Sequence, residues 1–528
     1  MQKSFLFLFL ATFFLANMVA QQKQITVEDI YSGTFRTEGL DALRSLANGK
    51  QYTILNYDRK AQTTAIDTYD YKTLQKIGTV VSSTELPEVP NFTSYEYSTD
   101  ETKLLLASDV ESIFRRSTLG LYHVYDIASK KFTKIANAKI QEPSLSPDGK
   151  QVAYVLNNNL YTFNIATGET SQLTTDGVKN KIINGVTDWV YEEEFSFVRA
   201  FEWNSEGTKI AFLRFDETKV PEFSMDVYGT ELYQKPYVFK YPKAGENNAI
   251  VTLHMYDIAT GTITDVDLGN AYYIPRIKWM NDPNSLSVQT INRHQNDLKL
   301  HHVNAKDNSV ILLLEEKDEA YVDIHDNLTF LADDSFIWSS EKDGWNHIYL
   351  HSEDGKLMNQ ITKGPWEVTA YYGYDQNEDK VYYQSTENGS INRGVYSIDS
   401  NGMIKKALAA EAGTNDADFS ADFTYFIKTF SSAATPPTYT LHKALTGKNL
   451  KDIKDNSALL TTLKSYEIAP KEFSTIAING NDLNMYMIKP KDFDISKKYP
   501  LFMTQYSGPG SQSVSNGWMS ANDYWHQM

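Results

Sequence analysis

The chain contains no cysteine among its 528 residues. Disulfide bonds, thiolate metal sites, a cysteine nucleophile and a lipid-modified N-terminal cysteine are therefore excluded. A chain of this size without disulfides must be stabilised by its hydrophobic core, and an apolar content of 41% is sufficient for one. In an exported protein, the lack of disulfides fits a bacterial cell envelope better than an animal extracellular space.

Positive charge is also scarce, because 50 Lys and Arg residues face 67 Asp and Glu residues and give a net charge of -17. No basic stripe offsets phosphate repulsion, so we do not expect a nucleic-acid partner. The oxygen-ligand pattern of a calcium loop is absent as well, and we expect no metal and no cofactor. The chain also lacks a Gly-x-Ser-x-Gly sequence, the usual setting of an α/β-hydrolase nucleophile.

A long apolar run occurs only at the N-terminus. Lys3 supplies a positive flank, the apolar run from Phe5 to Leu15 is short for a bilayer span, and Ala20 is a small residue suited to cleavage before Gln21. This pattern predicts a signal peptide over residues 1–20, with an uncleaved anchor as the alternative. We therefore expect an exported protein, either periplasmic or associated with the cell envelope, with secretion as a further alternative.

The middle of the chain is repetitive and rich in strand-forming residues, with 34 Tyr and 26 Phe in the whole sequence. The clearest unit has a Pro-Asp-Gly turn at 147–149, followed by strand patterns at 151–156 and 160–163. Similar units recur about eight times at spacings of roughly 35 to 65 residues, which is typical of propeller blades. We predict a mainly β fold with an eight-bladed β-propeller over residues 49–465, reached through an N-terminal segment at 21–48.

Two insertions interrupt the repeat, at about 179–203 and 220–249. Insertions of this kind often carry binding residues. The first contains three consecutive carboxylates, Glu192 to Glu194, surrounded by aromatic residues. Three acids in a row are usually a solvated surface. Adjacent carboxylates that point into a cavity would instead shift each other's pKa and bind a cation such as a substrate ammonium.

The sequence changes character after residue 465. A hairpin pattern with an Asn-Gly turn at 479–480 is followed by a buried-type strand pattern at 501–506 and a Ser-Gly-Pro-Gly loop. This order is typical of the start of an α/β-hydrolase domain. We therefore interpret residues 466–528 as the truncated start of an α/β-hydrolase domain.

The string Asn-Gly-Val-Thr-Asp-Trp-Val-Tyr-Glu-Glu-Glu at 184–194 resembles the signature of dipeptidyl peptidase IV, in the prolyl oligopeptidase family of serine peptidases. Further strings match the same family in the same order, and the resemblance extends over roughly residues 25 to 520. These strings are Tyr-Pro-Lys-Ala-Gly at 241–245, Thr-Lys-Gly-Pro-Trp-Glu-Val at 362–368, Asp-Asn-Ser-Ala-Leu at 455–459 and Tyr-Pro-Leu…Tyr-Ser-Gly-Pro at 499–509.

The resemblance implies roles for individual residues. Glu193 and Glu194 would bind the free α-ammonium of the substrate. Arg115 would bind the carbonyl of the first substrate residue, although the adjacent Arg116 could take this role instead, and a surface arginine pair is the alternative to both. Tyr506 would donate its hydroxyl to the oxyanion, with a buried core tyrosine as the alternative.

The resemblance further implies an exported serine exopeptidase that releases N-terminal Xaa-Pro dipeptides, and Xaa-Ala dipeptides less readily. The Ser, Asp and His of the triad would follow residue 528, so this chain alone should be inactive. Peptides with a free N-terminus and Pro or Ala second are the expected partners. A homodimer is one expectation, because relatives are commonly dimers. The alternative function is a non-catalytic propeller that binds peptides or acts as a scaffold. The coding sequence after codon 528 would discriminate between the two.

Overall fold

The computed structural model describes residues 22–86, 89, 91–506, 508 and 510–528, so the predicted signal peptide at residues 1–20 lies outside the described residues. The fold is mainly β and contains the eight sheets of an eight-bladed β-propeller, which confirms the prediction from the repeats. The chain divides into two compact units, one of Asp41–Lys363 with Ser400–Gly402, and one of Gly364–Asp399 and Met403–Met528 with the described part of Met1–Leu40.

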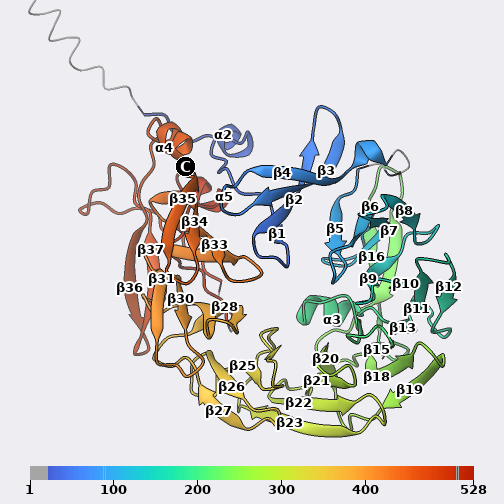
Figure 1. The fold of residues 1–528 in the computed structure, drawn as a ribbon. Coiled ribbons are helices and arrows are strands. Elements are labelled where there is room, and N and C mark those ends of the chain that lie inside the picture. The colour runs from blue at the N-terminus through green and yellow to red at the C-terminus, as the bar shows by residue number, and fades with distance from the viewer. Residues whose placement is uncertain (1–21, 87–88, 90, 507, 509) are drawn as a thin grey trace, which may run out of the picture. The chain divides into compact units, whose positions relative to one another are not determined.

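The first unit contains six blades (Figure 1), and the strands in each blade pair with neighbours in an antiparallel arrangement. Strand β1 begins at Leu43, before the start of the propeller that we predicted at residue 49. The elements of blades one to three are β1 (Leu43–Ser45), β2 (Gln51–Asp58), β3 (Thr63–Asp70), β4 (Lys76–Ser82), η1 (Ser83–Glu85), β5 (Ser94–Tyr97), β6 (Lys103–Ser112), β7 (Thr118–Asp126), β8 (Lys131–Lys134), β9 (Gln141–Leu145), β10 (Gln151–Leu156), β11 (Asn159–Asn164) and β12 (Thr170–Gln172). The strands of blades four to six are β13 (Ile182–Asn184), β14 (Phe201–Trp203), β15 (Lys209–Asp216), β18 (Ile250–Asp257), β19 (Thr262–Val266), β20 (Tyr273–Trp279), β21 (Ser285–Ile291), β22 (Asp297–Asn304), β23 (Val310–Lys317), β24 (Thr329–Phe330), β25 (Phe336–Ser340), β26 (His347–His351) and β27 (Leu357–Gln360).

The Pro-Asp-Gly turn joins β9 to β10, as its sequence predicts. Gly149 has a φ of 66°, which favours glycine, and its N–H donates to the Ser146 carbonyl over 2.8 Å. The Ser146 hydroxyl donates to the Asp148 carboxylate over 2.6 Å. Local turn chemistry therefore fixes where one blade strand ends and the next begins.

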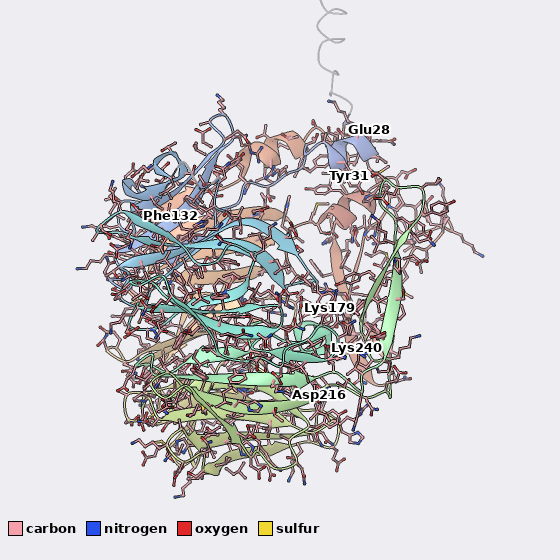
Figure 2. The ribbon with its side chains drawn as sticks, turned by 90° about the vertical axis from the view of Figure 1, so that its right-hand side faces the viewer. Glu28, Tyr31, Phe132, Lys179, Asp216 and Lys240 are labelled. Atoms are coloured by element: carbon pink, nitrogen blue, oxygen red, sulfur yellow. The ribbon has the colours of Figure 1, made fainter. Side chains whose placement is uncertain are left out.

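The fourth blade contains both predicted insertions. Strands β13 and β14 pair with opposite ends of β15, and the helix α3 (Trp189–Glu194) lies in the segment between them. The second insertion forms a separate hairpin of β16 (Glu222–Val227) and β17 (Lys235–Lys240), which we call the insertion hairpin. Figure 2 shows the hairpin strands running across the direction of the blade strands, with labels on Asp216 and Lys240 at the ends of β15 and β17.

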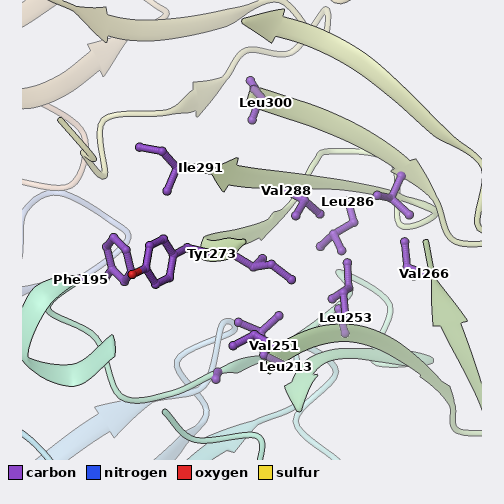
Figure 3. Close-up of a cluster of buried hydrophobic side chains, with 14 of the residues drawn as sticks. Phe195, Leu213, Val251, Leu253, Val266, Tyr273, Leu286, Val288, Ile291 and Leu300 are labelled. Atoms are coloured by element: carbon purple, nitrogen blue, oxygen red, sulfur yellow. The ribbon is translucent and has the colours of Figure 1, made fainter. Parts of the chain in front are cut away.

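A large apolar core joins blades four, five and six. Figure 3 shows the part of it that blades four and five contribute. Leu213 and Leu253 come from blade four, Leu286 and Leu300 from blade five, and all are at most 1% exposed. Tyr191 and Phe195, in and just after α3, belong to the same core. The helix that carries the acidic triplet is therefore attached to the most extensively packed part of this unit.

The second unit contains the two remaining blades and a small helical core. Its blade strands are β28 (Val368–Asp375), β29 (Lys380–Ser385), β30 (Gly394–Ile398), β31 (Lys405–Ala409), β32 (Thr414–Phe419), β33 (Tyr425–Ser432), β34 (Thr435–Lys443) and β35 (Lys448–Lys454). The helices are α2 (Val27–Tyr31), α4 (Ser457–Leu463) and α5 (Ala521–Trp525). Their side chains share a core of Ile25, Phe35, Leu459, Leu463, Tyr466 and Tyr524.

The hairpin predicted after residue 465 is present, but the strand predicted at 501–506 is not. Strands β36 (Glu472–Ile478) and β37 (Asn481–Met487) are joined by Asn479 and Gly480, both with positive φ, as an Asn-Gly hairpin turn requires. Residues 501–506 form no strand, and Leu501, Phe502 and Met503 are 77–82% exposed. The prediction was wrong for this segment because a strand needs hydrogen-bonded neighbours, and no described strand pairs with it.

Candidate functional site

Helix α3 is short, and a buried carboxylate defines its start. The Asp188 carboxylate caps the helix by accepting the N–H of Tyr191 over 3.0 Å. Asp188 is 5% exposed, and its burial raises the pKa of its carboxyl to about 6. The helix ends at Glu194, and Ser196 then has a φ of 62°, a left-handed conformation that turns the chain away.

Tyr191 anchors α3 to the core. Its hydroxyl accepts the N–H of Ile274 over 2.9 Å, which links the helix to strand β20 of the next blade. Its ring meets those of Phe195 and Phe215 edge-on, with centroids 5.0 and 4.9 Å away. Because Tyr191 is fixed on the inner face of this short helix, the acidic side chains that follow it have defined directions.

The three carboxylates of the triplet have three different environments. Glu192 is buried, Glu193 is partly buried and Glu194 is exposed. Glu194 forms no ion pair with any side chain that the structure describes. A helix turns by about 100° per residue, so consecutive side chains cannot share one environment.

Arg115 and Glu193 are brought together from blades two and four. Arg115 lies in the segment 113–117 between β6 and β7, which we call the arginine loop, and its Nε donates to Glu193 Oε2 over 2.8 Å. The side chain of Arg115 is 68% exposed and that of Glu193 is 28% exposed. The hydrogen bond from Arg115 lowers the pKa of the Glu193 carboxyl, so Glu193 is ionised at neutral pH.

The neighbouring Arg116 makes a different contact. Its guanidinium donates to the Ser196 hydroxyl, just after α3, over 2.9 Å. Its backbone N–H and that of Ser117 both donate to Glu192 Oε1, over 2.6 and 2.9 Å. Arg115 and Arg116 therefore both contact the α3 segment. Sequence reasoning missed the role of Glu192, because nothing in the local pattern distinguishes it from the two acids that follow.

Aromatic side chains from the insertion hairpin and from the residue directly after it pack against both sides of this site. Tyr241 lies against Trp189 of α3, with ring centroids 4.3 Å apart, and Phe239 lies against Phe114 of the arginine loop at 5.6 Å. Sequence reasoning missed these contacts, although the alternation of aromatic residues at 237, 239 and 241 is a signal that could have indicated a packing face.

A second buried carboxyl lies at the base of this insertion. Glu217 is 6% exposed, and burial raises the pKa of its carboxyl to about 8, with a further contribution from the nearby charge of Asp188. Lys240 acts in the opposite direction. Burial behind α3 therefore raises the pKa of the Asp188 and Glu217 carboxyls, whereas the hydrogen bond from Arg115 lowers the pKa of Glu193 on the outer face.

Tyr506 belongs to the second compact unit. Its side chain is 77% exposed, so it is not a buried core tyrosine. Its backbone N–H donates to the Ser513 hydroxyl over 3.3 Å, and that hydroxyl donates to the Tyr506 carbonyl over 3.1 Å. Ser507 and Pro509 of the predicted loop lie outside the described residues.

Two other kinds of site have no candidate among the residues that the structure describes. Over the described ranges, no three or more His, Asp or Glu side chains are grouped so that they could hold a metal ion. The same part of the chain contains no helix with the length and apolar character needed to cross a membrane.

Comparison with known families identifies this arrangement. Residues 98–437 match the family described as the dipeptidyl peptidase IV (DPP IV) N-terminal region, a range that contains α3 and the arginine loop. The chain belongs to the dipeptidyl peptidase IV family. Glu193, Glu194 and Arg115 thus lie in the part of the chain by which the family is recognised.

Dipeptidyl peptidase IV relatives match most of this chain. Dipeptidyl peptidase 4 of Trichophyton tonsurans is 32% identical over 467 residues, covering 84% of this chain and 59% of the relative. That of Arthroderma otae is 30% identical over 465 residues, covering 83% and 59%. The crystal structure of Porphyromonas gingivalis dipeptidyl peptidase 4 matches with a TM-score of 0.90 and 38% identity, covering 96% of this chain and 73% of that one. The chain spans 59% of the length of these two curated dipeptidyl peptidases.

Proposed function

We propose that this chain is the substrate-recognition part of an exported serine exopeptidase that releases Xaa-Pro dipeptides, and Xaa-Ala dipeptides less readily, from peptide N-termini. Its membership of the dipeptidyl peptidase IV family and the names of its relatives support this proposal. The observation that carries it is the Arg115–Glu193 pair beside the exposed Glu194.

This site has the chemistry to hold a peptide N-terminus. An α-ammonium group is a compact cation with three N–H donors, and it would bind the ionised Glu193 together with Glu194. Arg115 pairs with Glu193 through Nε, so its other N–H donors are suited to the carbonyl oxygen of the first substrate residue. An internal peptide residue has no ammonium group, so this site would select chain ends.

Anchoring the N-terminus also selects the bond to be cleaved. Two extended residues span about 7 Å, at about 3.3–3.6 Å per residue, so a fixed N-terminus presents the second peptide bond to the nucleophile. The reaction would be acyl transfer through a serine ester, with the serine, aspartate and histidine supplied by the remainder of the protein. Tyr506 would donate its hydroxyl to the oxyanion formed when the serine attacks.

We also propose where in the cell the protein acts. Residues 1–20 would direct export to the periplasm or cell envelope, where peptides with free N-termini are available as substrates. The protein would act without a metal or cofactor, as a homodimer.

Conservative substitutions in the acidic pair test the proposal in the protein expressed from its complete reading frame. Glu193→Gln and Glu194→Gln should each lower kcat/KM for Ala-Pro-p-nitroanilide by about 100-fold, because each removes a charge-assisted contact to the ammonium. Glu353→Gln, at an exposed turn between β26 and β27, is the matched control and should leave kcat/KM unchanged.

Acetylation of the substrate provides an independent check. The N-acetylated substrate lacks the ammonium and should be hydrolysed poorly by the wild type and equally poorly by both variants. Unchanged turnover of Ala-Pro-p-nitroanilide in both Gln variants would rule out the proposed N-terminal anchor. Binding of free N-termini without turnover would instead support a non-catalytic binding protein.

A further inference from the structure

The Glu192 side chain connects helix α3 to the arginine loop, the two segments that carry the proposed substrate-binding residues. It is 1% exposed, yet its carboxylate belongs to neither a side-chain ion pair nor a metal site among the described residues. Instead, Oε1 accepts two consecutive backbone N–H groups of the arginine loop, those of Arg116 and Ser117. Burying a carboxylate costs free energy unless it is well hydrogen-bonded. The burial of Glu192 therefore calls for a function that accounts for this cost.

We propose that Glu192 is a positioning residue that sets the separation between Arg115 and the acidic pair Glu193 and Glu194. This proposal rests on the proposed function, because it concerns how the same peptide site keeps its dimensions. Glu192 does not touch the substrate in this scheme. It acts through the backbone of the loop that carries Arg115.

The arginine loop is closed by its own hydrogen bonds, so the contact with Glu192 positions the loop as a rigid unit. The Ile113 N–H donates to the Ser117 carbonyl over 2.8 Å, and the Phe114 N–H donates to the Ser117 hydroxyl over 3.3 Å. Two anchored amides next to Arg115 therefore fix the backbone position of Arg115 as well. A single exposed ion pair between long side chains could not do this, because such pairs contribute little in water.

Helix α3, which carries Glu192, is also fixed in position. Glu192 follows directly after Tyr191, whose hydroxyl accepts the Ile274 N–H and whose ring is in the main core. Asp188 caps the same helix. The chain thus runs from the core through Tyr191 to Glu192 and on to the arginine loop, with Glu193 and Glu194 next in sequence. Arg115 and the acidic pair are thus both held in place by the same rigid helix, α3. This is the arrangement expected of a preorganised site.

Removal of the Glu192 carboxylate should affect the alignment of the substrate more than the folding of the protein. In Glu192→Ala the arginine loop loses both anchors, and a displacement of about 1 Å at a positioning contact can cost about 100-fold in rate. We expect Glu192→Ala to lower kcat/KM for Ala-Pro-p-nitroanilide by about 10- to 100-fold, mainly through KM. Glu192→Gln keeps an acceptor oxygen and should recover much of this loss. Glu353→Ala is the matched control and should behave as the wild type.

Two further measurements separate positioning from general damage. Hydrogen exchange followed by mass spectrometry should show faster exchange over residues 113–117 in Glu192→Ala, with the core strands unchanged. Hydrolysis of p-nitrophenyl acetate, which has no amino group to anchor, should remain at the wild-type rate in the same variant. A merely destabilised enzyme would lose both activities.

The outcomes distinguish this inference from the proposed function. Unchanged hydrogen exchange over residues 113–117 in Glu192→Ala would overturn the positioning role of Glu192. Faster exchange over these residues with an unchanged kcat/KM would overturn it as well. Equal loss of the ester and dipeptide activities would overturn positioning in favour of a structural role. If Glu192→Ala does not fold, Glu192→Gln decides through the same exchange and KM measurements. Absence of Ala-Pro-p-nitroanilide cleavage by the wild type would refute the proposed function, while the exchange result would still decide whether Glu192 holds the loop.

Discussion

At the scale of single residues, three identical side chains in a row acquire three different chemistries. Glu192 is buried on backbone N–H groups, Glu193 is paired with Arg115, and Glu194 is exposed. The difference arises from the rotation of the helix and from the fixed orientation of Tyr191. The resemblance to a family singled out Glu193 and Glu194, but it gave no role to Glu192. Such a role depends on the arginine loop, which is distant in sequence.

Glu217 leads to a prediction about pH at the same scale. Its folded pKa, about 8, lies above the ordinary value of 4.5, so the folded state binds a proton that the unfolded state releases. Stability should therefore fall as pH rises from about 4.5 to 8. Glu217→Gln removes this titration and should be more stable than the wild type by about 4 kcal/mol at pH 8, but by only about 1 kcal/mol at pH 5.

Urea unfolding at both pH values measures this effect. Glu169→Gln, at an exposed position, is the control and should retain the wild-type pH dependence. Asp188, whose pKa is also raised, would leave a smaller slope between about pH 4 and 6 in the Glu217→Gln variant. Identical pH slopes for the wild type and Glu217→Gln would contradict the prediction.

At the scale of elements, the insertion hairpin is separate from its blade but in contact with the site. Strands β15 and β18 pair without interruption from Lys209 with Asp257 to Asp216 with Ile250, so the blade does not need the insertion between them. The hairpin has its own ladder from Glu222 with Lys240 to Val227 with Lys235. Phe239 of the hairpin nevertheless lies against Phe114, and Tyr241, directly after the hairpin, lies against Trp189. The contribution of the hairpin should therefore be to the site rather than to the fold.

Replacement of residues 222–240 by a short Gly-Ser linker tests this separation. We expect the urea midpoint to change little, because the blade ladder is retained. KM for Ala-Pro-p-nitroanilide should rise by about 10-fold, because the arginine loop loses the packing of Phe114 against Phe239. Replacement of the exposed turn 228–234 alone is the control and should leave KM unchanged. A large loss of stability with an unchanged KM would reverse this assignment.

At the scale of the whole chain, negative charge exceeds positive charge. The net charge of -17 creates a field that attracts cationic ligands over a distance of about one Debye length. The N-terminus of a peptide is itself cationic, and a basic first residue adds to the attraction. Charge at this scale should change how fast substrates arrive rather than where they bind.

Salt dependence tests this expectation. For a Lys-Pro substrate, kcat/KM should fall several-fold as salt is raised from low ionic strength to about 0.5 M, because screening shortens the range of attraction. A Glu-Pro substrate is the control and should show a much weaker dependence, since its first side chain is repelled. Equal salt dependence for the two substrates would show that the overall charge does not steer them.

The sequence alone determined the features that depend on local chemistry. Turn residues and alternating apolar patterns gave the blades, and Asn479 with Gly480 gave the hairpin β36–β37, because φ preferences and side-chain alternation act over a few residues. The segment 501–506 shows the limit of such patterns. Its composition favours a strand, but a strand forms only where neighbours complete its hydrogen bonds.

Only the tertiary structure decided how the site is assembled. Arg115 and Glu193 are 78 residues apart, and Phe114 meets Phe239 from a separate insertion. The burial of Glu192 and of Glu217 likewise depends on which segments pack over them. The sequence identified the acids of the triplet 192–194 but not Glu217. The packing of distant segments determined which of them is buried, which is paired and which is exposed, because burial and pairing are properties of the folded neighbourhood.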